Sequence, residues 1–261
     1  MMHPLLQHKT LFLDLDGTMY RGDEVIAGAV AFVDALNHLR LPYYFLTNNA
    51  MRTHAQNREK MEAMGFNGIR DEQFITSAMA AASYVRHERP WKRVYYIGEQ
   101  GMEEALLEQG FTLCDEDVEA VFAGLDSHVT YEKLCRGFYH LQKGARLIGT
   151  NPDRRLPHGD YFHIGNGAMV HMLEYCSEQQ ALMIGKPHTP MLQEALRYAG
   201  IEKEAALMIG DNLETDVAFG LNNGCSTIFV TTGVHTRQDC ENSGPVSYTH
   251  LEEPMRICQS I

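Results

Sequence analysis

The sequence predicts an α/β fold in which a doubly wound parallel sheet, a Rossmann-like core, is interrupted by an inserted α/β domain. Short apolar runs alternate with helical patterns along the 261 residues, as expected of a parallel sheet covered by helices. The first run, Thr10–Leu15, is apolar enough to be a buried central strand. The alternation restarts after position 90 and continues long enough to build a second core. We therefore expect a core domain over residues 1–80 and 183–261 and an inserted domain over 81–182.

The elements of the core domain follow from local patterns. After the first strand, Val30, Val33, Leu36 and Leu39 recur at three-residue steps and mark one face of a helix. Gly65 stands where the C-cap of a polar helix is expected. The other core elements are expected in this order: a strand at 43–46, helices at 53–64 and 77–86, a strand at 182–184, a helix at 190–198, a strand at 206–209, a helix at 214–221 and a strand at 227–230.

The insert repeats the alternation of strands and helices. Thr130 is suited to cap a helix, because its hydroxyl can accept a hydrogen bond from an N–H group of the first turn. We expect strands at 93–97, 120–123 and 146–148 and helices at 103–109, 131–142 and 168–175. The segment 151–160 is rich in Pro, Asp and Gly and is expected to form a loop.

Composition argues against several classes of function. Lys and Arg number 22 and Asp and Glu 34, which gives a net charge of −12 and argues against a nucleic acid or an anionic membrane as partner. No apolar run approaches the roughly 20 residues that span a bilayer. Lys9, Asp14 and Asp16 interrupt the first apolar stretch, unlike the layout of a signal peptide. The six cysteines form no C-x-x-C pair, as expected of free thiols in a reducing compartment, so we expect a soluble cytoplasmic protein.

Polar residues follow four of the strands predicted for the core. In chain order they are Asp14, Asp16, Thr47, Asn48, Asn49, Lys186, Asp211 and Asp216. Each group alone is typical of a turn or of a solvated side chain. Ligands of a doubly wound sheet bind outside the carboxyl ends of its strands. We therefore expect the four groups to meet at one edge of the core sheet, where their coincidence indicates a functional site.

This combination of residue types suits phosphoryl transfer through an aspartyl-phosphate. A carboxylate can attack phosphorus and divide hydrolysis into two easier displacements. Because carboxylates and phosphate oxygens repel one another, magnesium is needed to neutralise the site. A lysine supplies further positive charge as the leaving group departs. A second aspartate can protonate the leaving oxygen and later take a proton from water.

These motifs resemble those of the haloacid dehalogenase superfamily across nearly the whole chain. The four matching motifs are Asp14-Leu15-Asp16-Gly17-Thr18, Thr47-Asn48, Lys186, and Gly210-Asp211 through Asp216. The insert is similar to the α/β cap of the NagD/p-nitrophenyl-phosphatase branch, and three of its segments carry that similarity: Gly124-Leu125-Asp126, Thr130–Leu134 and Thr150-Asn151-Pro152-Asp153. The resemblance implies an inserted α/β cap domain that closes over the substrate and often mediates dimerisation, so we expect a homodimer through the cap.

The resemblance also implies the catalytic and metal-binding roles. Asp14 would be the nucleophile and Asp16 the general acid and base. Mg²⁺ would sit on the Asp14 carboxylate, the Asp16 backbone carbonyl and the Asp211 carboxylate. Asp216 would orient Lys186 or a metal-bound water.

Four residues would bind the phosphoryl group by the same resemblance, namely Thr47, Asn48, Asn49 and Lys186, of which Lys186 also counts as catalytic. We therefore expect a magnesium-dependent phosphatase that hydrolyses a small phosphomonoester. Two alternatives stay open. One is a phosphotransferase or mutase, in which another acceptor replaces water, and the other is a binding protein that retains the fold without turnover.

One segment departs from the pattern of this branch. Where the branch commonly has Pro-Gly-x-Gly, the chain has Ile164-Gly165-Asn166-Gly167. The residues before it, 154–163, include two arginines, two histidines and two aromatic residues. We interpret them as a solvated surface loop, and the alternative is a site for an anionic or planar leaving group. This departure leaves the identity of the substrate open.

The 13 histidines show no ligand spacing typical of a zinc site.

Overall fold

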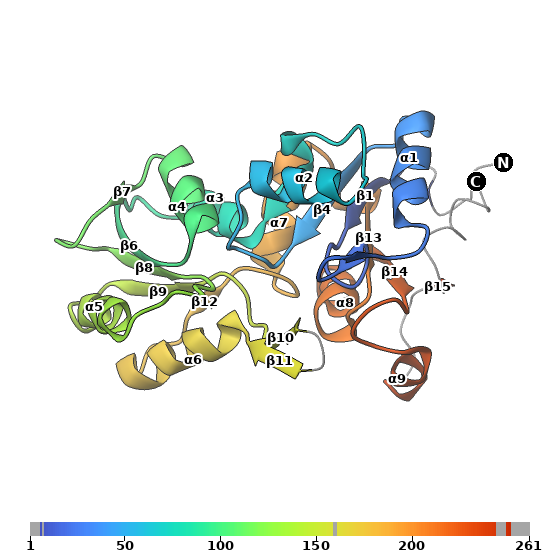
Figure 1. The fold of residues 1–261 in the computed structure, drawn as a ribbon. Coiled ribbons are helices and arrows are strands. Elements are labelled where there is room, and N and C mark those ends of the chain that lie inside the picture. The colour runs from blue at the N-terminus through green and yellow to red at the C-terminus, as the bar shows by residue number, and fades with distance from the viewer. Residues whose placement is uncertain (1–5, 7, 159–160, 244–248, 252–261) are drawn as a thin grey trace. The chain divides into compact units, whose positions relative to one another are not determined.

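The structure, a computed structural model, describes residues 6, 8–158, 161–243 and 249–251 (Figure 1). The chain divides into two compact units. The first unit comprises Met1–Thr47, Ala55–Ile75 and Ala195–Ile261, and the second comprises Asn48–His54 and Thr76–Glu194. The sequence predicts an insert over residues 81–182. The second unit extends beyond these bounds in both directions along the chain.

The first unit is built on a six-stranded sheet with the order β15-β14-β13-β1-β4-β5. Its strands are β1 (Thr10–Leu13), β4 (Tyr43–Thr47), β5 (Phe74–Thr76), β13 (Ala206–Gly210), β14 (Ser226–Val230) and β15 (Thr249–Leu251). β1 pairs in parallel with both β4 and β13, and β13 with β14. The chain adds strands on one side of β1 first and on the other side later. The strand order therefore reverses between β1 and β13, where ligands of such sheets bind.

Helices cover both faces of this sheet. They are α1 (Ala29–Leu39), α2 (His54–Ala63), α7 (Thr189–Ala199), α8 (Ala218–Asn223) and α9 (Arg237–Asn242). Only the part of α7 from Ala195 onward belongs to this unit. The unit also contains a π-helical turn at Leu213–Val217 and a small ribbon of β2 (Tyr20–Arg21) and β3 (Glu24–Val25). On one face, Phe32 of α1 and Met61 of α2 pack in one core with Leu13 and Phe45. Side chains of a strand alternate between faces, so their neighbours in sequence point the other way.

The opposite face has its own contacts. The ring of Phe12 in β1 stacks 6.0 Å from Tyr44, which lies 5.9 Å from Tyr198 in the C-terminal part of α7. Phe229 of β14 packs with Cys240 of α9. These contacts confirm the predicted doubly wound α/β sheet.

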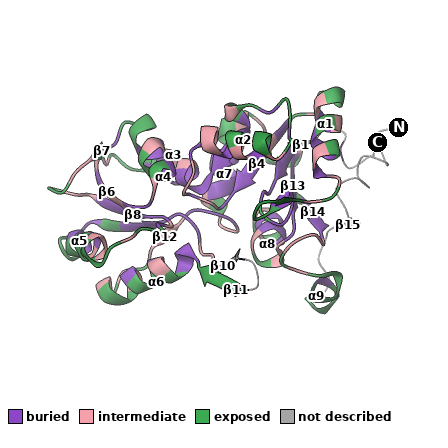
Figure 2. Cartoon of the chain, viewed as in Figure 1, coloured by how far each residue is buried: buried purple, intermediate pink, exposed green. Residues whose placement is uncertain are grey.

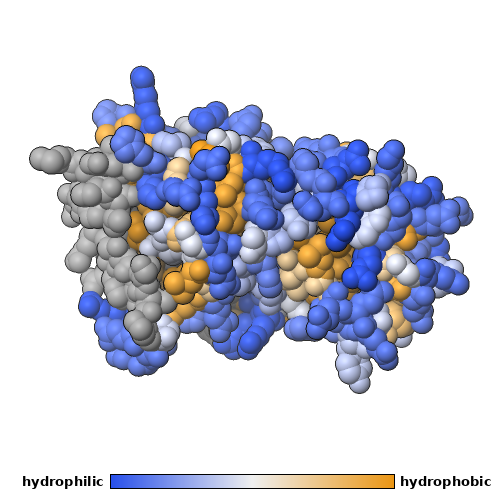
Figure 3. All heavy atoms as spheres, turned by 180° about the vertical axis from the view of Figure 1, so that it is seen from behind, coloured by the Kyte–Doolittle hydropathy of each residue, from blue (hydrophilic) through white to orange (hydrophobic). Residues whose placement is uncertain are grey.

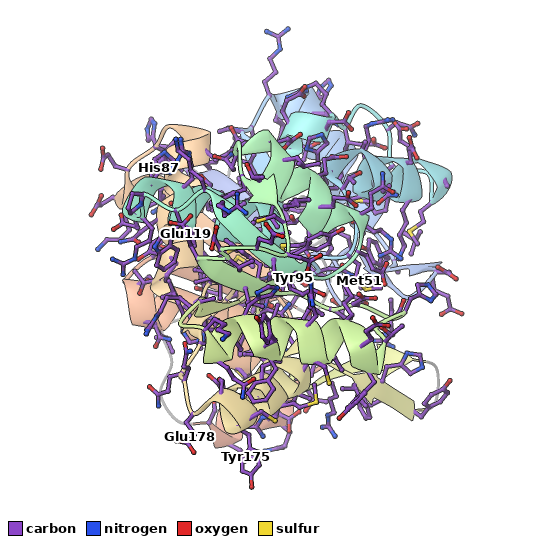
Figure 4. All side chains as sticks on the ribbon, turned by 90° about the vertical axis from the view of Figure 1, so that its left-hand side faces the viewer. Met51, His87, Tyr95, Glu119, Tyr175 and Glu178 are labelled. Atoms are coloured by element: carbon purple, nitrogen blue, oxygen red, sulfur yellow. The ribbon has the colours of Figure 1, made fainter. Side chains whose placement is uncertain are left out.

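The second unit contains a five-stranded parallel sheet with the order β12-β9-β8-β6-β7. Its strands are β6 (Arg93–Ile97), β7 (Thr112–Leu113), β8 (Ala120–Ala123), β9 (Arg146–Gly149) and β12 (Leu182–Met183), and its helices are α3 (Ser77–Glu88), α4 (Gln100–Glu108), α5 (Tyr131–Gln142) and α6 (Asn166–Ser177). Leu141 of α5 and Val170 of α6 pack on Val121 and Leu147. The strands β1, β4, β13 and β14 of the first sheet and β8 and β9 of the second are largely buried (Figure 2). Tyr175, by contrast, is 89% exposed and points away from α6 (Figure 4).

Two predictions for this part of the chain are wrong. The strand near 182–184 was expected in the core sheet, but Leu182 and Met183 pair with Ile148 and Gly149 of β9 in the second unit. The pairing continues beyond the strand, because the N–H of Gly185 donates to the carbonyl of Thr150 at 2.7 Å. The expected loop at 151–160 also contains β10 (Arg155–His158), which pairs antiparallel with β11 (Tyr161–Ile164).

The surface agrees with the acidic, polar composition. In the space-filling view from behind, hydrophilic residues predominate and apolar residues gather in separate patches (Figure 3). Among the residues that the structure describes, no helix combines the length and the apolar character needed to cross a membrane.

Candidate active site

Three carboxylates converge in the first unit. Asp14 directly follows β1 and Asp211 directly follows β13, its neighbour in the sheet, while Asp216 lies in the π-helical turn. One carboxylate oxygen from each residue lies within 4.8 Å of the others. Asp14 is 8% exposed, and Asp211 and Asp216 are each 1% exposed. Buried carboxylates at this separation repel one another, so the group suits a site for a divalent cation.

Asp211 is fixed by the segment that follows Asp14. The hydroxyl of Thr18 donates to Asp211 Oδ1 at 2.9 Å, and the N–H of Val234 donates to Oδ2 at 2.7 Å. Gly17 has a φ of +93°, and a Cβ at this position would lie 2.4 Å from Asp211 Oδ2. Glycine is therefore required here both for the backbone conformation and for the close approach of the carboxylate. This explains the Gly-Thr pair after the two aspartates.

Asp216 lies beside the other two carboxylates. The sequence predicts that it acts on Lys186 or on a metal-bound water, and one of its oxygens belongs to the cluster of three. The N–H of Asn212 donates to Asp216 Oδ2 at 3.1 Å. A Cβ on Gly210 would lie 2.3 Å from the Asp216 Cγ, so the glycine at the end of β13 makes room for this side chain.

The two remaining predicted residues of the first unit differ in exposure. Asp16 is exposed and lies at the tight turn in which the N–H of Gly17 donates to the carbonyl of Tyr20 at 2.7 Å. Its carboxylate is not part of the cluster of three. Thr47 is 4% exposed and ends β4, which is the other neighbour of β1. Thr47, Asp14 and Asp211 therefore lie at the carboxyl ends of three adjacent strands, as the sequence predicted for these residues.

Asn48 and Lys186 form a second group, which lies in the second unit. The Lys186 N–H donates to Asn48 Oδ1 at 2.8 Å, and Asn48 Nδ2 donates to the Lys186 carbonyl at 3.0 Å. Asn48 Nδ2 also donates to Asp153 Oδ1 at 3.1 Å. Asn48 is 8% exposed and Lys186 is 1% exposed, so both are shielded from water. Asn49 lies next to them in the chain, and its Oδ1 accepts from the N–H of Met51 at 2.8 Å.

The group includes residues to which the sequence gave no role. The carbonyl of Asn48 accepts from Asn151 Nδ2 at 2.7 Å and from the hydroxyl of Ser77. Asn151 and Asp153 belong to the Thr-Asn-Pro-Asp segment that resembles the cap signature. That segment was visible in the sequence, but nothing in it indicated a bond to Asn48, because the two lie more than 100 residues apart, with 103 separating Asn48 from Asn151.

The segment that departs from the branch pattern packs on the same loop. Asn166 is 1% exposed, and its Nδ2 lies 3.2, 3.0 and 3.2 Å from the Ala123 carbonyl, the Thr150 hydroxyl and the Asn151 carbonyl. In the hairpin before it, Arg155 and the four residues of β11 are exposed instead. The Arg155 guanidinium lies 4.2 Å from the ring centre of Phe162, which is 55% exposed. The sequence predicted this surface character and missed the hairpin.

A second set of side chains could hold a metal ion. His54 joins Glu104 and Glu108 of α4, with ligand atoms within 4.8 Å of one another. The two glutamates are four residues apart on one helix face. The sequence did not indicate this set because its histidine is distant in the chain. Its side chains are half-buried or exposed, whereas Asp211 and Asp216 are buried.

Comparison with known families identifies related sequences along most of the chain. A model of haloacid dehalogenase-like hydrolases matches residues 11–112, and a model described as HAD-hydrolase-like matches residues 183–254. An acid sugar phosphatase of Staphylococcus epidermidis is 40% identical over 254 residues, which cover 97% of this chain and 98% of that protein.

Solved structures share the fold. A mutant of the thermostable NPPase from Geobacillus stearothermophilus matches with a TM-score of 0.85 and 38% identity, covering 94% of this chain and 96% of that one. NagD from E. coli K-12 matches with a TM-score of 0.86 and 29% identity, covering 94% of this chain and 96% of that one.

Proposed function

Because this chain belongs to the NagD branch of the haloacid dehalogenase superfamily and is a phosphatase, we propose that it hydrolyses a small phosphomonoester with Mg²⁺ through an aspartyl-phosphate. The observation that carries the proposal is the convergence of Asp14, Asp211 and Asp216 at the carboxyl ends of β1 and β13. A nucleophilic carboxylate and an oxygen-rich metal site are the two components that this chemistry requires.

The donor set fits magnesium. Mg²⁺ prefers oxygen ligands and is commonly held by one or two carboxylates together with the phosphate of the substrate. Asp14, Asp211 and Asp216 supply carboxylate oxygens, and the Asp16 backbone carbonyl is a further candidate. When bound, the ion would offset the negative charge that the carboxylates and the phosphoryl oxygens bring together.

In the first displacement, a carboxylate oxygen of Asp14 forms a bond to phosphorus while the bond from phosphorus to the ester oxygen breaks. Asp16 donates its proton to the departing oxygen, so that the alcohol leaves as a neutral molecule. The exposed position of Asp16 supports this role, because a general acid that serves substrate and water must be accessible to both. The product is the phosphorylated Asp14.

In the second displacement, water attacks the phosphorus of the aspartyl-phosphate. Asp16, now a carboxylate, accepts a proton from that water molecule. The bond between the Asp14 oxygen and phosphorus breaks, which releases inorganic phosphate and restores both aspartates to their starting states.

Lys186 and Thr47 would bind the transferring group. A lysine that is 1% exposed lies in a medium of low polarity, where its charge stabilises a phosphoryl transition state more strongly than it would in water. Thr47 contributes a hydroxyl at the end of β4, and Asn49 contributes polar groups in the same Thr-Asn-Asn segment.

We propose sugar phosphates as the substrate class. The support is the relative named acid sugar phosphatase, which matches almost the whole chain. The test is phosphate release from a panel of sugar phosphates, nucleoside monophosphates, glycerol phosphate and p-nitrophenyl phosphate, each with Mg²⁺ and with a chelator. We expect magnesium-dependent release, with the highest kcat/KM for a sugar phosphate.

The same panel separates the proposal from its alternatives. Phosphate release that is unchanged by the chelator would contradict the metal assignment. Transfer to an added alcohol with little release of phosphate would favour a phosphotransferase. A higher kcat/KM for nucleotides than for sugar phosphates would overturn the substrate class and leave the reaction intact.

A further inference from the structure

We propose that Asp153 is a positioning residue for Lys186 and that it acts through the side-chain amide of Asn48. The inference rests on the proposed function, because it concerns the lysine assigned to phosphoryl transfer. Asp153 lies in the loop after β9, Asn48 directly after β4 and Lys186 after β12. Hydrogen bonds within the second unit join these three segments.

The Asn48 amide binds the Lys186 peptide at two points. Its Oδ1 accepts from the Lys186 N–H at 2.8 Å, and its Nδ2 donates to the Lys186 carbonyl at 3.0 Å. A pair of opposed hydrogen bonds to one residue restricts the rotation of its backbone as well as its position. Since the direction of a side chain follows from its backbone, this contact sets where the Lys186 ammonium can reach.

Asp153 adds a third contact to the two that set which way the Asn48 amide is turned. A carboxylate only accepts hydrogen bonds, so the neighbour of Asp153 must be the nitrogen of the Asn48 amide and not its oxygen. Asn48 Nδ2 lies 3.1 Å from Asp153 Oδ1 and 3.4 Å from Oδ2. With the nitrogen directed to Asp153, Oδ1 is left to accept from the Lys186 N–H. Reversal of the amide would set oxygen against oxygen and lose both bonds to Lys186.

Asp153 is itself held in place by its own backbone. Its N–H donates to Asn151 Oδ1 at 3.1 Å, and its carbonyl accepts from the N–H of Gly167 at 2.8 Å. Asn151 in turn donates to the carbonyl of Asn48 at 2.7 Å. The loop after β9 therefore forms hydrogen bonds to both the backbone and the side chain of Asn48.

This network changes the expected role of Asn48. An asparagine amide has two donor hydrogens. Here one is directed to Asp153 and the other to Lys186, so the side chain has no donor left for a phosphoryl oxygen. The Asn48 side chain therefore positions the Lys186 backbone, although its place beside Thr47 suggested contact with the substrate.

The first test measures kcat and KM for phosphate release by Asp153→Asn. Asparagine keeps the shape but has no charge and one acceptor oxygen in place of two, and it can present an N–H to Asn48, so the Asn48 amide is held less firmly. We expect kcat to fall roughly ten- to a hundredfold with KM changed by less than about threefold, because a small misplacement of a catalytic group costs that much in rate. Asp126→Asn is the matched control, since Asp126 is a buried aspartate of the same unit that accepts from Lys133 and His128.

The second test combines Asp153→Asn with Lys186→Ala. If Asp153 acts through Lys186, the double variant should lose less than about twofold beyond Lys186→Ala alone, because the interaction partner is already absent. A full additional loss would overturn the proposal, as would an Asp153→Asn variant with parental kcat.

The third test needs no activity. Exchange of the Lys186 amide proton, followed by NMR, should be faster by about tenfold or more in Asn48→Ala and Asp153→Asn and unchanged in Asp126→Asn. Unchanged exchange in Asp153→Asn would contradict the proposed contact. If the parent protein releases no phosphate, the proposed function fails, and this measurement still decides whether Asp153 positions Lys186.

Discussion

The two groups of functional side chains are built in different ways, although each unit contains a parallel sheet. In the first unit, Thr47, Asp14 and Asp211 lie at the carboxyl ends of the adjacent strands β4, β1 and β13, so the sheet itself places them together. In the second unit, Asn48 and Lys186 are 138 positions apart and are joined by side-chain hydrogen bonds to peptide groups. One group depends on strand order, and the other depends on a set of loop contacts.

The difference explains which substitutions each group should tolerate. A strand end keeps its position when one side chain is exchanged for another of similar shape, so changes in the first unit act mainly on chemistry and charge. A loop held by side-chain amides loses its geometry when one of them is removed. We therefore expect loss of reaction from the first group and loss of positioning or of stability from the second.

The largest effect is expected from Asp14→Asn. The substitution keeps the size of the side chain but removes the oxygen proposed as nucleophile and one charge of the proposed metal site. We expect phosphate release to fall by at least about a thousandfold, more than for Asp153→Asn, because no other group replaces the nucleophile. Asp23→Asn, at an exposed aspartate of the same unit, should keep parental activity. Activity of Asp14→Asn within tenfold of the parent would refute its role.

Removal of the metal ion should come next and should be reversible. We expect a chelator to lower activity by at least about a hundredfold and added Mg²⁺ to restore it. Mg²⁺ at a hundred times its Kd should also raise the free energy of unfolding by about 2.7 kcal/mol, because it binds the folded state alone. Asp216→Asn should weaken this stabilisation, while Asp153→Asn should leave it unchanged. The measurement is a thermal-shift titration with Mg²⁺. Equal stabilisation of Asp216→Asn and Asp153→Asn by the ion would contradict the distinction between the side chains of the first unit and those of the second.

The same contrast shows what the sequence could predict. Asp14 and Asp211 were predicted correctly as neighbours, because both follow apolar strands and parallel strands end at one edge. Lys186 was assigned to the wrong sheet, because the two residues of β12 carry no signal for which strand they pair with. The role of Asp153 was invisible, since its bond to Asn48 spans 105 positions and depends on loop conformation. Local patterns predict the order of elements, and they do not predict contacts between loops.

Gly17→Ala should have a smaller effect, on stability, that is specific to the first group. Gly17 and Gly65 share a φ of +93°, but a Cβ on Gly17 would lie 2.4 Å from Asp211, whereas nothing lies within 4 Å of a Cβ on Gly65. We expect Gly65→Ala to lower the free energy of unfolding by about 1 kcal/mol from backbone strain alone. Gly17→Ala should cost about 2 kcal/mol more, from the clash with the carboxylate. Equal losses in urea unfolding would show that Asp211 moves aside without cost.

The smallest effect is expected from Asn166→Ala in the second unit. The Asn166 amide donates to the carbonyls of Ala123 and Asn151. In the variant the Ala123 carbonyl keeps its bond from the N–H of Thr150, whereas the Asn151 carbonyl loses a buried partner. We expect a loss of about 1–2 kcal/mol in urea unfolding, because an unsatisfied buried acceptor keeps its desolvation cost. Asn67→Ala provides the control, since Asn67 is exposed and also donates to a carbonyl, that of Gly65. Water can replace that bond, so its loss should cost less than about 0.5 kcal/mol. If the two variants unfold alike, burial does not strengthen the amide contacts of the second unit, and its loop is held by other means.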